Sequence, residues 1–195
     1  MNSPETVEKN IKKKPSVKDE VFDWILEIVT AVVALLLVFT FAFRTVDVYG
    51  TSMLPTLHHG EKLLLNRFLY TPEYGDIVVI TKPCDGDEPL IKRIIATENQ
   101  EIDIDFEKGI VYVDGVALQE SYIYAPTTRS FDVTFPCVVP EGHVFVLGDN
   151  RNNSKDSRSS EVGFVDKETV LGKVVFRVLP FGDTDVYENF NQGEE

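Results

Sequence analysis

Two residues of this chain have the chemistry of a hydrolytic site, although they lie in separate segments. Ser52 stands between Gly50 and Pro55, two residue types that favour a turn. Lys92 lies forty residues later, in the Leu- and Ile-rich run Leu90–Ile95. A serine hydroxyl is a weak nucleophile that needs a base. A lysine can be that base when its surroundings lower its pKa toward the working pH.

The environment of Lys92 can be interpreted in two ways. On a β-strand, Lys92 shares one face with Leu90 and Ile94, while Arg93 points to the other face. A buried amine then has a lowered pKa, at a folding cost of about 3–4 kcal/mol for two to three pKa units. Alternatively, the apolar stem packs and the amine reaches water. Periodicity alone favours this second interpretation.

Other catalytic chemistries have less support. The chain has three histidines, His58, His59 and His143, but neither a Gly-x-Ser-x-Gly nor an HExxH motif, so we expect them to be loop or surface residues. Its two cysteines, Cys84 and Cys137, lack metal-ligand spacing and are interpreted as structural or incidental. Whether they pair with each other stays open.

A third polar segment, Gly148–Arg158, completes a pattern that identifies a family. The chain resembles the type I signal peptidases, which are membrane-anchored serine endopeptidases with a Ser/Lys dyad. Gly-x-Ser-Met-x-Pro-Thr-Leu around Ser52 is similar to the nucleophile box of that family. Gly75–Val79, the Lys92-Arg93 pair and Gly148–Arg158 match further boxes in the family's order. The resemblance extends from Val48 to about Leu179.

The resemblance implies roles for individual residues. Ser52 is the expected nucleophile, with its backbone N–H as an oxyanion donor, and Lys92 is the expected general base. Ser154 is expected to hydrogen-bond and orient the lysine amine. Gly50 occupies the position where some members carry a second, side-chain oxyanion donor, so that donor is left open. The supporting residues that we expect are Met53 of the nucleophile box and two ion pairs, Arg93 with Asp149 and Arg158 with Asp156.

The resemblance also implies what the protein acts on. The expected substrate is the signal peptide of an exported preprotein, cleaved after a small-x-small motif. The expected mechanism needs no cofactor and no metal ion.

An apolar segment near the N-terminus predicts a membrane anchor. Residues 24–43 are apolar apart from Glu27, and about 20 such residues span a bilayer as a helix. A cleaved signal peptide fits poorly, because the preceding region is long and acid-rich and a good cleavage site is lacking. A buried soluble helix would need a polar face, which Ala31–Phe39 does not offer.

The distribution of basic residues predicts the direction of the anchor. One arginine, Arg44, lies between Phe43 and Glu61, whereas five lysines precede the anchor. The positive-inside rule therefore predicts a cytoplasmic tail over residues 1–23 and an extracytoplasmic catalytic domain over residues 44–195 of a plasma-membrane protein. The five lysines are Lys9, Lys12, Lys13, Lys14 and Lys18.

The overall charge excludes one class of partner. The formal net charge is −13, so phosphates would repel the chain and a nucleic-acid partner is not expected. The expected partners are preprotein signal peptides and the lipid bilayer, and the sequence leaves the oligomeric state open.

Beyond the anchor, residue alternation predicts an all-β antiparallel fold. Asp114-Gly115, between Val113 and Val116, is a strong hairpin signal. Resemblance adds a signal-peptidase/repressor-autoprotease-like fold, with a smaller β subdomain inserted at about residues 98–140. The expected strands are Lys62–Arg67, Asp76–Ile80, Leu90–Ala96, Glu101–Phe106, Gly109–Val113, Val144–Leu147 and Lys173–Val178.

Three alternatives to a general signal peptidase remain. A specialised relative could process a narrow substrate set such as a pilin precursor. Self-cleaving repressor-type proteins share the Ser/Lys β fold, but they are soluble and usually carry a DNA-binding segment. An anchored β-domain adhesin or receptor would leave Lys92 and Gly148–Arg158 unexplained.

Overall fold

One long helix precedes the β-strands in the computed structural model, which describes residues 17–68, 70–81 and 89–180. Helix α1 (Val17–Ala42) starts before the apolar segment expected at residues 24–43, because helical hydrogen bonding can continue through the polar residues that precede it. Its apolar part, Glu20–Ala42, has the length and composition to cross a membrane. At 1.5 Å per residue it measures about 35 Å.

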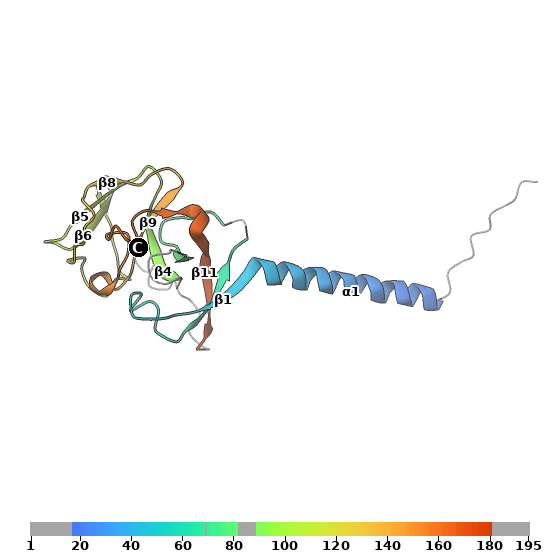
Figure 1. The fold of residues 1–195 in the computed structure, drawn as a ribbon. Coiled ribbons are helices and arrows are strands. Elements are labelled where there is room, and N and C mark those ends of the chain that lie inside the picture. Colours follow the sequence, from blue (N-terminus) through green and yellow to red (C-terminus); the bar gives the residue numbers. More distant parts are fainter. Residues whose placement is uncertain (1–16, 69, 82–88, 181–195) are drawn as a thin grey trace, which may run out of the picture. The chain divides into compact units, whose positions relative to one another are not determined.

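The rest of the described chain is mostly antiparallel β-sheet, as the residue alternation predicts (Figure 1). A seven-stranded sheet has the order β1-β2-β11-β3-β4-β9-β10, and a four-stranded sheet has the order β7-β6-β5-β8. The strands of the first sheet are β1 (Phe43–Asp47), β2 (Lys62–Asn66), β3 (Ile77–Ile80), β4 (Leu90–Thr97), β9 (His143–Leu147), β10 (Val165–Asp166) and β11 (Val170–Leu179).

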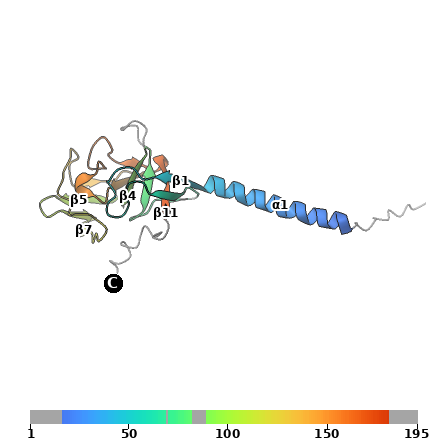
Figure 2. The same ribbon diagram turned by 90° about the horizontal axis from the view of Figure 1, so that it is seen from below.

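The second sheet forms within one stretch of sequence. Its strands are β5 (Glu101–Asp105), β6 (Ile110–Val113), β7 (Val116–Ala117) and β8 (Cys137–Val138). In Figure 1, β5, β6 and β8 lie on one side of β4 and β9, with β1 and β11 on the other, and Figure 2 shows the same arrangement from below.

The expected strands are present, with small shifts at their ends, and so is the hairpin turn at Asp114-Gly115, where both residues have positive φ. The alternation does not predict β1, β7, β8 or β10. Strands β7, β8 and β10 have two residues each, and β1 follows directly on the apolar helix.

The apolar core has three clusters, and strand β4 contributes to all of them. Ile91 belongs to the first cluster, Ile95 to the second and Ile94 to the third. Both faces of β4 are therefore covered, and its burial pattern shows six consecutive buried residues. Because neither face meets solvent, Lys92 and Arg93 are both buried. Cys137 packs against the second cluster, and Cys84 lies outside the described residues.

Candidate active site

The fold brings Ser52 and Lys92 into contact. Lys92 lies in β4 directly opposite Val78 of β3, and its Nζ is 3.0 Å from Ser52 Oγ. Lys92 is 3% exposed, so the interpretation in which its amine reaches water is wrong. The same amine donates a hydrogen bond to the Ile91 carbonyl at 2.9 Å. Both residues line a cavity of about 230 Å³ between the segments Asp47–Met53 and Pro89–Lys92.

A closed loop between β1 and β2 holds Ser52. At its base, Val48 N–H donates to the Glu61 carbonyl at 2.8 Å. Two side chains of the loop, Met53 and Leu57, are fully buried in the first core cluster. The Met53 side chain therefore fixes the backbone next to Ser52, whereas Ser52 itself is half-buried and faces the cavity.

Burial changes the acid–base chemistry of Lys92. Desolvation of the ammonium form lowers the pKa of Lys92 to about 8, and the charges of Asp156 and Asp149 act in the opposite direction. The neutral amine is the form that can accept a proton. At pH 8 about half of the amine is neutral, compared with well under a hundredth for an exposed lysine.

The segment after β9 fixes the backbone of the serine loop through three hydrogen bonds. Asn150 N–H donates to the Ser52 carbonyl at 2.9 Å, and Asn150 Nδ2 donates to the Thr51 carbonyl at 3.0 Å. Asn153 Nδ2 donates to Thr51 Oγ1 at 3.0 Å. These contacts set the position of Ser52 relative to β4.

Gly148 lies where this segment comes closest to the serine loop. A Cβ at this position would lie 2.2 Å from Ser154 Oγ and 2.6 Å from the Ser52 carbonyl oxygen. Both distances are far below van der Waals contact, and the second involves backbone. Only glycine therefore fits without displacing Ser52.

We expect Gly148→Ala to lower kcat/KM by about 100-fold, because a displacement of about 1 Å at a reacting group has that effect and Ser52 is the expected nucleophile. The measurement is steady-state cleavage of a preprotein by the folded variant. Adding Ser154→Gly to Gly148→Ala should restore part of the activity, since it removes the shorter of the two contacts. Normal activity in the single variant would contradict the packing argument.

Ser154 does not make the hydrogen bond that the resemblance implied. Its Oγ is buried and has no hydrogen-bond partner among the described residues. The Lys92 amine instead contacts Ser52 and the carbonyl of Ile91. The role of Ser154 seen in the structure is to pack closely against Gly148.

The two expected ion pairs are present, and both are buried. Arg93 Nη2 is 2.7 Å from Asp149 Oδ2, and Arg158 Nε is 2.8 Å from Asp156 Oδ1. All four side chains are at most 1% exposed. They are therefore not the weak surface pairs that charged loops usually form.

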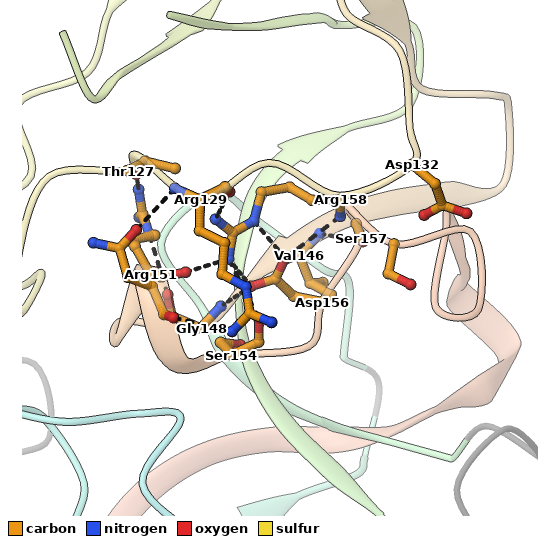
Figure 3. Close-up of polar contacts among 12 residues, drawn as sticks. Thr127, Arg129, Asp132, Val146, Gly148, Arg151, Ser154, Asp156, Ser157 and Arg158 are labelled. Atoms are coloured by element: carbon orange, nitrogen blue, oxygen red, sulfur yellow. Dashed lines mark hydrogen bonds and ion pairs between the residues drawn. The ribbon is translucent and has the colours of Figure 1, made fainter. Parts of the chain in front are cut away.

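The sequence does not reveal a third buried pair, Arg151 with Glu120. Arg151 Nη2 is 2.6 Å from Glu120 Oε1, and its Nη1 also donates to Thr127 Oγ1 at 3.0 Å. Figure 3 shows Arg151 and Arg158 side by side, with Thr127 and Arg129 of the neighbouring segment close to them. Glu120 follows β7 in a segment without a recognisable motif, so no local signal identifies it.

The first two histidines are exposed, and His143 is half-buried. His59 Nδ1 accepts a hydrogen bond from the Gly50 N–H at 3.2 Å, and His58 lies 3.5 Å from Glu61. Because Ser52 already contacts Lys92, the geometry does not require a histidine base.

Comparison with known proteins gives a consistent result. The model of the signal peptidase, peptidase S26 family matches residues 21–179. A signal peptidase I from Bacillus licheniformis is 37% identical over 185 residues, covering 88% of this chain and 96% of that protein. A probable signal peptidase I-1 from Synechocystis is 40% identical over 166 residues, covering 80% of each. A solved signal peptidase I from Enterococcus faecalis covers 54% of this chain and 98% of its own, with 28% identity and a TM-score of 0.46.

The family model and the two sequence relatives identify the class of protein as a serine peptidase, a hydrolase. The chain belongs to the signal peptidase, peptidase S26 family, whose model covers most of its length. The resemblance that its sequence motifs indicate is thereby confirmed.

Proposed function

We propose that this protein is a membrane-anchored endopeptidase that cleaves signal peptides from exported preproteins after a small-x-small motif. The observation that carries the proposal is the 3.0 Å contact between Ser52 Oγ and the buried amine of Lys92. Ser52 is the proposed nucleophile and Lys92 the proposed general base. The substrate class is supported by two relatives that are named signal peptidases and that match most of this chain.

The proposed reaction has two stages. Neutral Lys92 accepts the Ser52 proton while Ser52 Oγ attacks the scissile carbonyl, and the resulting ammonium then gives a proton to the leaving amine. Water, activated by the same amine, hydrolyses the acyl-enzyme. The Ser52 backbone N–H is the proposed donor to the oxyanion. Among the described residues, it has no other hydrogen-bond acceptor.

The test of the proposal is incubation of the purified protein with a preprotein that carries a small-x-small site. The new N-terminus is then sequenced. Cleavage directly after the second small residue supports the proposal, provided that it depends on Ser52. Cleavage elsewhere, or none with any preprotein, would contradict it.

We further propose that residues 1–23 lie in the cytoplasm, residues 24–43 lie in the membrane, and residues 44–195 form the catalytic domain outside the membrane. Within that domain, the segment at about residues 98–140 is the proposed smaller subdomain, and the second sheet lies inside it. Chain length supports the placement of Ser52 near the outer surface. It follows Phe43 by nine residues, which span at most about 30 Å when fully extended.

We expect a periplasm- or exterior-active reporter fused after Glu195 to be active, and protease added to intact cells to digest the domain after Phe43. The physical reason is the excess of lysines before the apolar segment at residues 24–43. A fusion of the same reporter to residues 1–23 alone is the control and should stay cytoplasmic. An inactive reporter after Glu195, in a fusion protein that is made at full length, would overturn both the orientation and the substrate assignment.

A further inference from the structure

Within residues 17–68, 70–81 and 89–180, the buried charges near Lys92 form three closed pairs, and no carboxylate is bonded to the lysine amine. Each pair joins a guanidinium to a carboxylate through two hydrogen bonds of 2.6–2.8 Å. All six side chains are at most 5% exposed. The three pairs are neutral as a group, so protonation of Lys92 adds one uncompensated charge. The pairs are Arg93 with Asp149, Arg151 with Glu120 and Arg158 with Asp156.

Two of these carboxylates lie close to the Ser52–Lys92 contact. Asp149 is bonded to Arg93, the residue after Lys92, and Asp156 is bonded to the N–H of Gly148, which packs against the Ser52 carbonyl. The charges of both raise the pKa of Lys92. Each is occupied in full by its own neighbours. Asp149 accepts two hydrogen bonds from Arg93 and a third from Thr56 Oγ1 at 2.5 Å. Asp156 accepts two from the Arg158 side chain and one from the Gly148 N–H at 3.1 Å. A carboxylate with these contacts cannot turn toward the lysine amine without losing them.

We propose that Arg93 and Arg158 are electrostatic screens: each neutralises the carboxylate that would otherwise hold a proton on Lys92, and so keeps the base able to accept one. The proposal rests on the assignment of Lys92 as general base. It makes the two arginines positioning residues, because they act on the reaction through Lys92 and the carboxylates.

The other titratable groups that the structure describes near this site are bonded elsewhere or neutral. Asp47 lines the same cavity but pairs with Lys62 at 2.8 Å, and both are more than a third exposed. Asp76, which precedes β3, pairs with Lys173. Tyr122 lies beneath the Arg93 guanidinium at 4.1 Å, and burial raises the pKa of its hydroxyl, which stays neutral.

The test is the pH dependence of kcat/KM in a set of three variants of the full chain in detergent or nanodiscs. Arg158→Gln leaves the Asp156 charge uncompensated, so the midpoint of the rising limb should move up by about one pH unit. Asp156→Asn leaves the Arg158 charge uncompensated, and the midpoint should move down by about the same amount. The double variant removes both charges, and its midpoint should return to that of the unchanged protein.

Opposite shifts that cancel in the double variant cannot come from a merely structural role. A midpoint is measured relative to the plateau of each variant, so partial loss of folded protein lowers the plateau and leaves the midpoint in place. Labelling of Ser52 by a serine-reactive probe at high pH counts the folded sites. The matched control is Arg177→Gln, which opens another buried pair, with Glu61, a residue that is not among the charges that raise the pKa of Lys92. Its midpoint should not move.

Equal midpoints in the three variants, or single-variant shifts of the same sign, would overturn the screening role. If Lys92→Arg is inactive while these midpoints stay fixed, the assignment of Lys92 as general base stands, and only the proposed screening role of the arginines fails. If Lys92→Arg remains active, the base assignment itself fails.

Discussion

Replacing Ser52 with alanine is expected to lower kcat/KM for preprotein cleavage by at least about 10⁴-fold, because no covalent intermediate can then form. The substitution removes one hydroxyl from a half-buried side chain. The neighbouring Met53 and Leu57 remain buried in the first core cluster, so the loop should keep its conformation. The measurement is release of the mature N-terminus under single-turnover conditions.

A second serine provides the control for this result. Ser160 is exposed and bonded to Asp132, so Ser160→Ala should cleave the preprotein at the normal rate. A serine-reactive probe should label the unchanged protein and Ser160→Ala, but not Ser52→Ala. Near-normal turnover in folded Ser52→Ala would show that another residue is the nucleophile.

The second large effect is expected at Lys92. Lys92→Arg should be as inactive as Lys92→Ala, because a guanidinium keeps its proton throughout the working pH range and cannot act as a base. If Lys92 were only a structural cation, arginine would preserve part of the activity and alanine would not. The measurement is kcat/KM for both variants across the pH range of the unchanged protein. Substantial activity in Lys92→Arg would overturn the general-base role.

The pH profile of the unchanged protein gives the same test a second readout. In the proposed mechanism the neutral amine is the active form, so activity should rise with pH and reach its midpoint near the lowered pKa of Lys92, about 8. Below this pKa the amine is protonated and activity falls. Changing His58, His59 and His143 together to Gln should leave the rising limb in place. A limb that moves to the ordinary histidine pKa of about 6.5 would indicate a Ser-His mechanism instead.

Local patterns in the sequence were sufficient to predict several features. Alternation of apolar residues predicted most strands and the antiparallel class, because each strand must bury one or both faces. The turn residues around Ser52 and the apolar run around Lys92 made these two residues candidates, and the resemblance assigned them as nucleophile and base. The resemblance identified the family and the partners within the pairs Arg93–Asp149 and Arg158–Asp156. All of these features follow from a few adjacent residues or from motifs in a fixed order.

Other features depended on contacts between distant segments. Alternation alone favoured an exposed amine for Lys92. The structure shows that both faces of β4 are packed against other parts of the chain, so the Lys92 side chain is buried. The partner of Arg151 is Glu120, which lies in a segment without a recognisable motif. The Ser154 hydroxyl packs against Gly148 and makes no hydrogen bond to Lys92.

The physical reason for this division is the range of the interactions. Strand pattern, turns and helix length are set by neighbours along the chain, so the sequence by itself determines them. The pKa of Lys92 depends instead on desolvation by strands that lie far apart in the sequence and on carboxylates near residue 150. Whether those carboxylates act on the lysine or are neutralised by arginines is decided only when the tertiary structure brings all of them into one buried cluster.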